Sequence, residues 1–130
     1  MANIRSVREL SVWRDAMDAA TEIFEISKCF PAEERYSLTD QTRRSSRSVA
    51  ANIAEAWRKR RYDAAFRSKL NDSEAEACET QTWVEIALRC GYLKPDTASR
   101  LDQRYEHIVG KLVVMIRDSK KWELRLPADK

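Results

Sequence analysis

The sequence predicts an all-α fold, specifically an up-down-up-down antiparallel four-helix bundle. Glycine and proline, the residues that mark the turns of β-sheet proteins, are scarce, at 2 Gly and 3 Pro in 130 residues. The chain is 35% charged and 43% hydrophobic, which is typical of a folded helical protein and not of a disordered one. Four segments repeat apolar residues at spacings of three and four, the period of an amphipathic helix. The lack of glycine also argues against glycine-rich phosphate-binding loops.

The first helix is expected to end at Phe30-Pro31, because proline disfavours helical geometry in the residue before it. Ser6 with Glu9 resembles a capping box at its start, and Ser11 is an alternative start. Two apolar stripes lie side by side, so the apolar face is wide enough to pack on more than one neighbour. The stripes are Val12, Ala16, Ala19, Ile23, Ile26 and Phe30, and beside them Trp13, Met17, Ala20 and Phe24.

The other three helices follow the same periodicity. The second opens at Ser37, with Asp40 as a capping partner. The third ends at Gly91, a residue suited to the position after a helix, and the fourth begins at Pro95-Asp96 with proline in its first turn. Their inward stripes are Leu38, Thr42, Ser45, Val49, Asn52 or Ile53 and Ala56; Phe66, Leu70, Ser73, Ala77, Thr80, Val84 and Ala87; and Leu101, Tyr105, Ile108, Leu112 and Met115.

Three short links, at about residues 31–36, 58–61 and 91–95, join these helices. Short links between long helices force neighbouring helices to run antiparallel. We therefore expect one domain over residues 1–121, followed by a frayed tail over residues 122–130.

The cysteine count and the apolar runs bear on the compartment. The three cysteines are an odd number with no C-x-x-C pair, which favours a reducing compartment. No apolar run is long enough to cross a membrane, and the N-terminus has no apolar signal-peptide core. We expect a cytoplasmic protein with no membrane partner.

Polar residues on the inward stripes are expected to have structural roles. Asn52 needs a hydrogen-bond partner there, which makes it a register-setting residue. Arg44 is expected to form a salt bridge to Glu76 or Glu79 on the antiparallel third helix. Glu55 is interpreted as a structural partner and not as a catalytic carboxylate.

The formal net charge of +3 hides strong segregation of charge. Residues 43–69 hold nine basic and two acidic side chains. Residues 72–85 hold five acids and no base, and residues 9–25 hold five acids and one arginine. One end of the bundle, around the link between the second and third helices, is therefore expected to be basic.

The run Arg58-Lys59-Arg60-Arg61 is the clearest local feature of this basic segment. Clustered cations bind nucleic acid by releasing its counterions, and the flanking Trp57 and Tyr62 could stack on unpaired bases. The alternative is a solvated turn whose cations favour the negative end of the second helix. The candidate nucleic-acid-binding residues are Arg43, Arg47, Arg58, Lys59, Arg60, Arg61 and Arg67.

Catalytic chemistry has little support in the sequence. His107 is the only histidine, so Glu76-x-x-Glu79 lacks the Glu-x-x-His motifs of di-metal bundles. Cys78 lies beside glutamates and has no neighbouring base in the sequence to activate its thiol. A pairing of Cys78 or Cys90 with His107 stays open, and a hydrolase or metal enzyme is the weakest hypothesis. We expect no enzyme activity, no metal and no cofactor.

The stretch QTRRSSRSVAANIAE, residues 41–55, resembles the signature of the bacterial four helix bundle protein family, also called S23 or 23S rRNA intervening-sequence protein. Further similarity runs from Leu10 to Leu93, and it includes LSVW with Ala16, Phe30-Pro31 with Glu34, ETQTW with Ala87, and GYL. The chain departs from the pattern at Ala56, where the family has glycine, and at Arg47, where it often has a small or apolar residue. Because alanine does not favour a left-handed turn, the second helix is expected to run on into the basic cluster.

The resemblance implies a ring-like homopentamer. Relatives include accessory variability determinant proteins of diversity-generating retroelements, which bind nucleic acid and a reverse transcriptase. The expected function is a non-enzymatic homo-oligomer, with a pentamer favoured, that binds nucleic acid, RNA being favoured over DNA, through its basic end. A reverse transcriptase or another protein is a candidate partner. The alternative is a protein-interaction module that binds no nucleic acid.

Overall fold

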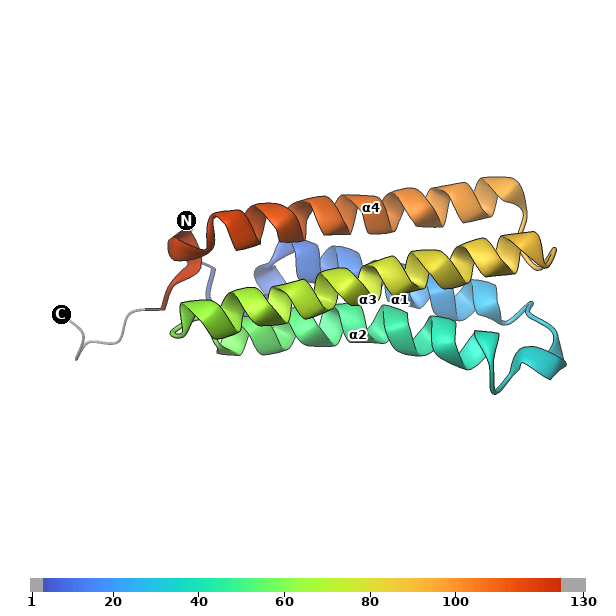
Figure 1. Ribbon diagram of the computed structural model, residues 1–130, viewed down its shortest axis with the longest axis horizontal. Coiled ribbons are helices and arrows are strands. Elements are labelled where there is room, and N and C mark those ends of the chain that lie inside the picture. The colour runs from blue at the N-terminus through green and yellow to red at the C-terminus, as the bar shows by residue number, and fades with distance from the viewer. Residues whose placement is uncertain (1–3, 125–130) are drawn as a thin grey trace.

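Four antiparallel helices form the bundle in the computed structural model, which describes residues 4–124 (Figure 1). This confirms the predicted fold class. The helices are α1 (Ser11–Ser27), α2 (Leu38–Arg58), α3 (Asp63–Arg89) and α4 (Pro95–Arg117). Three short 3-10 helices accompany them: η1 (Val7–Glu9) before α1, η2 (Ala32–Glu34) between α1 and α2, and η3 (Ser119–Trp122) after α4.

The start of α1 lies at Ser11, and the Ser6–Glu9 pair organises η1 instead. The Ser6 hydroxyl accepts a hydrogen bond from the Arg8 N–H at 3.2 Å. The Glu9 carboxylate accepts one from the Arg5 N–H at 3.0 Å. The predicted capping box therefore caps the 3-10 turn before α1, and α1 begins without a side-chain cap.

The predicted Ser37–Asp40 capping pair of α2 is not formed. Glu34, in the preceding turn, replaces it: its Oε1 atom accepts from the Leu38 N–H at 3.3 Å and from the Ser37 hydroxyl at 2.9 Å. The Tyr92 hydroxyl donates to the other Glu34 oxygen at 3.0 Å. One carboxylate thus satisfies the first turn of α2 and ties it to the α3–α4 link.

The remaining helix ends follow the sequence more closely. Ala56 continues α2, as expected without a glycine, but the helix covers only Arg58 of the basic run and stops at Lys59. Gly91 has a φ of 79°, the left-handed conformation that glycine adopts without strain. Pro95 lies in the first turn of α4 as predicted.

The core confirms the predicted inward stripes of α2, α3 and α4, whose residues are all buried. The first stripe of α1 is buried from Val12 to Ile23. The second stripe of α1 is different, because Met17 is 42% exposed and Phe24 is 36% exposed. No described segment of the chain covers this side of α1.

Hydrogen bonds between small residues join α2 to α3. The Thr80 hydroxyl donates to the Ser45 hydroxyl at 2.8 Å, and the Ser73 hydroxyl donates to the Val49 carbonyl at 2.7 Å. Because no large side chain separates the two backbones at these positions, α2 and α3 approach closely.

Lys69 of α3 reaches across to α2 and contacts two of the predicted structural residues. It donates to the Asn52 side-chain oxygen at 3.3 Å and lies 3.3 Å from the Glu55 carboxylate. Asn52 therefore has the partner that its position requires, and its role in fixing the register stays a prediction.

The predicted salt bridge from Arg44 to Glu76 or Glu79 is not formed among the described residues, and Arg44 is exposed. Burial and the neighbouring Glu79 raise the pKa of Glu76, and the more distant charge of Arg44 only opposes that rise. Arg44 instead lines a hollow at the start of α2 together with other arginines.

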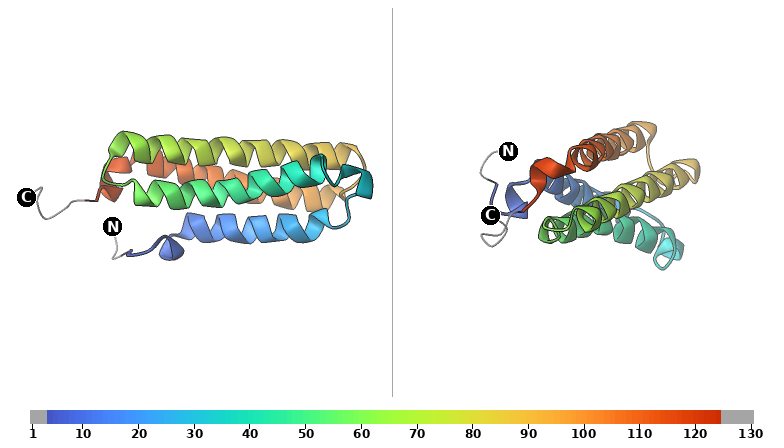
Figure 2. Two further views of the ribbon diagram at one scale, coloured as in Figure 1. Left: turned by 90° about the horizontal axis from the view of Figure 1, so that it is seen from below. Right: turned by 60° about the vertical axis from the view of Figure 1, so that its left-hand side comes forward.

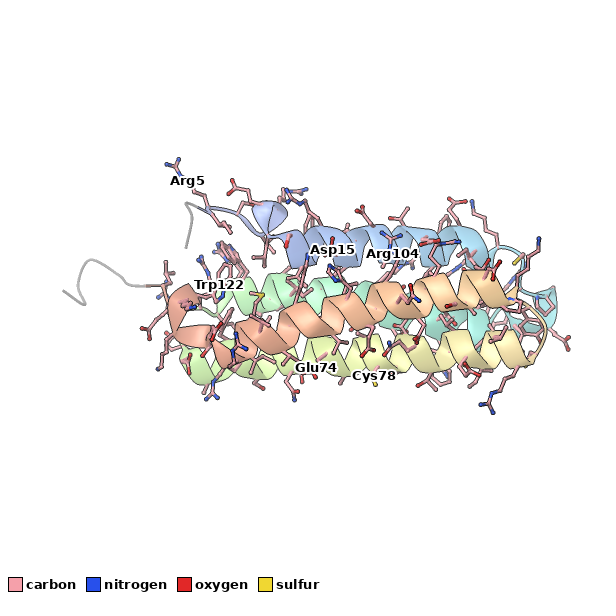
Figure 3. All side chains as sticks on the ribbon, turned by 90° about the horizontal axis from the view of Figure 1, so that it is seen from above. Arg5, Asp15, Glu74, Cys78, Arg104 and Trp122 are labelled. Atoms are coloured by element: carbon pink, nitrogen blue, oxygen red, sulfur yellow. The ribbon has the colours of Figure 1, made fainter. Side chains whose placement is uncertain are left out.

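Ion pairs hold α1 to α4 along the polar side of α1. Glu22 pairs with Arg100 and with Arg104, the latter at 2.6 Å, and Asp15 pairs with Lys111 at 2.5 Å. Figure 3 shows Asp15 and Arg104 at this boundary. Among the described residues, no helix is both long enough and apolar enough to cross a membrane.

Candidate nucleic-acid interface

The chain gathers cations at one end of the bundle. The N-terminal segment, the α2–α3 link, the end of α4 and η3 all meet there, at the left in Figure 1 and again in Figure 2. We call this surface the basic end. Its described cationic side chains are Arg5, Arg8, Arg58, Lys59, Arg60, Arg61, Arg117, Lys120 and Lys121, and its carboxylates are Glu9, Asp63, Asp118 and Glu123.

The sequence predicted residues 58–61 as part of this surface but not the cationic residues that come from the two ends of the described chain. Arg5 and Arg8 come from η1 and the segment before it, and Lys120 and Lys121 come from η3. They are far from residues 58–61 in sequence. Only the folded structure shows that η1 and η3 lie beside the α2–α3 link (Figure 1). The folded end is therefore broader than the predicted patch.

Asp63 holds η3 against the α2–α3 link. It accepts a hydrogen bond from the Ser119 hydroxyl at 2.7 Å and lies 3.8 Å from the Lys120 ammonium. These contacts lower the pKa of Asp63, the Ser119 bond most strongly. The Arg67 guanidinium is 3.1 Å from the same carboxylate, so this candidate residue is already paired.

Trp122 packs on Trp57, with ring centroids 6.4 Å apart. Trp122, the first residue of the expected frayed tail, is half-buried against the core. The Leu124 N–H donates to the Arg60 carbonyl at 3.4 Å. Residues 125–130 of the expected tail lie outside the described residues, and the limit of the domain at residue 121 stays a prediction.

Arg60 is part of the fold rather than of the free surface. Its guanidinium lies 3.5 Å from the centre of the Trp57 ring, and its Nε donates to the Trp57 carbonyl at 2.7 Å. Burial, and then the charge of Arg58, lower the pKa of Arg60. Trp57 is only 5% exposed, so the expected stacking of a base on Trp57 is ruled out in this conformation.

Arg58, Lys59 and Arg61 are the exposed members of the run. None of the three forms an ion pair within the described part of the chain. Tyr62, the other flanking aromatic residue, is 63% exposed beside them. Exposed cations and aromatic rings are the kinds of groups with which nucleic-acid-binding proteins contact phosphates and unpaired bases.

Arg43 and Arg47 do not extend this surface. Arg47 and Arg58 are eleven positions apart on α2, which places them about 16 Å apart along the helix axis. Arg43 is also engaged, since its Nε donates to the Ser27 hydroxyl at 2.7 Å and its guanidinium lies 4.8 Å from the Phe24 ring centre. The predicted basic segment therefore forms two separate clusters.

An apolar groove runs between α1 and α2. It is a hollow of about 470 Å³ with large side chains on the α1 wall and alanines on the α2 wall. We call it the α1–α2 groove. Its lining is Trp13, Met17, Ala20, Thr21, Phe24, Arg47, Ala50, Ala51 and Ala54. The second apolar stripe predicted for the first helix is thus the wall of an open groove.

The described residues offer no metal-binding cluster of His, Cys, Asp or Glu. His107 lies 3.9 Å from the Asp15 carboxylate. Across residues 4–124 neither Cys78 nor Cys90 makes a hydrogen bond to it. The geometry therefore gives the open Cys–His hypothesis no support.

The fold and the basic end define a helical-bundle protein with a cationic tip. Residues 8–114 match the model of the 23S rRNA-intervening sequence protein family, and the chain belongs to this family. A solved structure of a protein of unknown function from the S23 ribosomal protein family of Bacteroides thetaiotaomicron is 28% identical, with a TM-score of 0.74. The match covers 82% of this chain and 98% of that chain. No curated protein matches the chain.

Proposed function

We propose that the protein is a non-enzymatic, homo-oligomeric nucleic-acid-binding protein that contacts phosphates through its basic end. The observation that carries the proposal is the exposure of Arg58, Lys59 and Arg61 without carboxylate partners in the described part of the chain. The arginines of α3 and α4, by contrast, are paired with carboxylates, as at Glu22 and Glu85. Cations left unpaired together favour a polyanionic partner, because binding them releases the counterions of the nucleic acid.

RNA is favoured over DNA as the partner. Support comes from the family description, which refers to a sequence that intervenes in 23S rRNA. The exposed Tyr62 ring suits an unpaired base of a loop or strand end. The three cysteines are all free and exposed, which agrees with the proposed reducing, cytoplasmic setting.

Binding of a labelled, structured RNA at low salt tests the basic end. The variant Arg58→Gln/Lys59→Gln/Arg61→Gln is expected to lose about tenfold or more in affinity, because three phosphate contacts disappear. The control Lys28→Gln/Arg89→Gln/Lys94→Gln removes the same charge from the opposite end and should retain binding. Equal losses in both variants would show only an effect of net charge and would contradict the proposal.

Self-association is proposed through the α1–α2 groove, with a second copy of the chain as the occupant. The α3–α4 side of the bundle, opposite the groove, exposes Ile86 and Val113 among acidic residues that line its hollows. Arg47 lines the groove and Arg43 stacks on its Phe24. The hollows of the α3–α4 side hold four acidic and two basic residues, so the net charges of the two faces are opposite in sign. These acidic residues are Glu74, Glu85, Asp102 and Glu106.

Two different faces that meet in this way generate a head-to-tail interface, which closes into a ring when the rotation between copies allows it. Only such an interface can produce the odd number of copies that a pentamer requires. Five copies and a protein partner such as a reverse transcriptase are suggested by the family resemblance and stay predictions.

The second candidate function is an assembly module that binds no nucleic acid. The separate acidic and basic faces favour this second function, because pairing of one face with the other between copies would explain why both faces exist. Light scattering over a range of salt separates the two, because an assembly held by exposed charges weakens as salt rises. RNA binding that persists in a dissociated variant would exclude the assembly module as the whole function.

A further inference from the structure

A second cationic site lies near the start of α2, far from the basic end. Six residues line a hollow of about 370 Å³ there: Arg35, Thr39, Asp40, Arg43, Arg44 and Arg47. Five of them come from the first three turns of α2, and Arg35 comes from the turn before it. We call this hollow the arginine pocket. Four guanidinium groups face a single carboxylate, so the pocket carries an excess of positive charge.

The arginines of this pocket differ from the arginines of α3 and α4. Arg67, Arg89 and Arg100, for example, each form an ion pair with a carboxylate. In residues 4–124 none of the four pocket arginines does so, although Asp40 lines the same hollow.

Like charges three and four positions apart on a helix repel each other. Arg47 is spaced in this way from both Arg43 and Arg44. The first turn of α2 adds the positive end of the helix dipole. The pocket therefore concentrates positive charge that the described fold does not neutralise. An anion bound there would relieve the repulsion.

Arg43 is already held in place for such a ligand. Its Nε donates to the Ser27 hydroxyl, and its guanidinium stacks on Phe24. These contacts use one N–H group and leave the terminal amino groups of the planar guanidinium to bind oxygen atoms. A side chain that is fixed before binding loses less conformational entropy when the ligand arrives.

We propose that the arginine pocket binds a phosphate monoester group. Arginine matches phosphate because its planar guanidinium can donate two parallel hydrogen bonds to two oxygens. A monoester carries close to two negative charges at neutral pH, which suits four guanidinium groups and one carboxylate better than the single charge of an internal phosphodiester. The group belongs either to free phosphate or to the 5′ end of a nucleic-acid strand, and only the strand end rests on the proposed function.

Two titrations distinguish the two sources. Inorganic phosphate is titrated into the full chain by calorimetry, and anisotropy compares an RNA strand bearing a 5′-phosphate with the same strand bearing a 5′-hydroxyl. The test variant is Arg44→Gln/Arg47→Gln, because both side chains are exposed and removing them should leave the fold intact. The control Lys28→Gln/Arg89→Gln removes two exposed cations that belong to surface ion pairs.

We expect phosphate binding that weakens about tenfold in Arg44→Gln/Arg47→Gln, as lost charge-assisted hydrogen bonds would cause, and that is retained in the control. Asp40→Asn should strengthen binding, because it removes the one repelling carboxylate. A preference for the 5′-phosphorylated strand that disappears in the test variant assigns the group to a strand end. Phosphate binding at the pocket without that preference assigns it to free phosphate.

The proposal is overturned if the chain binds inorganic phosphate no better than the test variant does and shows no preference for the phosphorylated strand. That result leaves the proposed function standing when RNA binding still depends on Arg58, Lys59 and Arg61. The two failures are therefore distinguishable in one set of proteins.

Discussion

The two sides of α2 show how small residues act differently against different neighbours. Toward α3, small residues of α2 such as Ser45 meet small residues such as Thr80, and the helices close over hydrogen bonds. Toward α1, Ala51 and Ala54 face Trp13 and other large side chains, and an open groove remains. A small side chain lets two helices approach closely only when the side chain that faces it on the other helix is also small.

The largest expected effect on stability comes from enlarging a side chain in the contact between α2 and α3. Ala77→Leu places extra methylene groups in the α2–α3 contact, where Ala77 is fully buried, and should destabilise the protein by about 1–3 kcal/mol. The matched change Ala51→Leu, on the groove side, should alter stability by no more than about 0.5 kcal/mol. Urea unfolding midpoints measure both. Similar losses in the two variants would contradict the difference between the two sides.

The next effect concerns what covers the groove. Met17→Glu introduces a charge into the apolar wall of the α1–α2 groove and should lower the mass of the particle in solution, since a buried unpaired carboxylate is costly. Met17→Leu keeps the wall apolar and should keep the assembly. Light scattering coupled to gel filtration gives the masses. An unchanged mass for Met17→Glu would show that this groove is not the interface between copies.

The smallest expected effect on stability concerns Glu34, which lies in the turn before α2 and caps the start of that helix. Hydrogen bonds from Ser37, Tyr92 and the Leu38 N–H lower the pKa of Glu34 below its ordinary value of 4.5. Because the folded-state pKa is the lower one, Glu34 stabilises the fold above pH 4.5, and this contribution is lost as the pH falls through the folded pKa.

Glu34→Gln should therefore melt at a lower temperature than the parent protein at pH 7, and the difference should shrink at pH 3. Tyr92→Phe removes one of the three hydrogen bonds and should show a weaker form of the same trend. Melting curves at the two pH values measure it. A Glu34→Gln deficit that grows toward low pH would contradict the assigned cause.

The helices and the core were predictable because the apolar spacing of each inward stripe is local in the sequence. The third helix illustrates this, since its seven predicted residues from Phe66 to Ala87 are its seven buried residues. The cap of α2 was harder, because Glu34 precedes the helix and the pattern of Ser37 with Asp40 offered a local substitute. When two side chains near a helix start are both able to cap it, their positions in the folded structure determine which one bonds to the free backbone N–H groups.

The candidate site was only partly predictable. Four adjacent cations, Arg58 to Arg61, carry the same charge in the sequence, but Arg60 alone folds back over Trp57. That choice depends on where the helix ends and which ring lies beneath the side chain. Arg5 belongs to this surface because the segment before η1 lies at the same end of the bundle as the α2–α3 link (Figure 1). No local sequence pattern indicates that arrangement.

The most direct test of the central claim is the salt dependence of RNA binding. The logarithm of the affinity is plotted against the logarithm of salt concentration for the parent chain and for Arg58→Gln/Lys59→Gln/Arg61→Gln. The account predicts that the slope of the variant is shallower by about two to three units, because each lost phosphate contact removes about 0.7–0.9. Identical slopes would contradict the assignment of these residues to phosphate contacts.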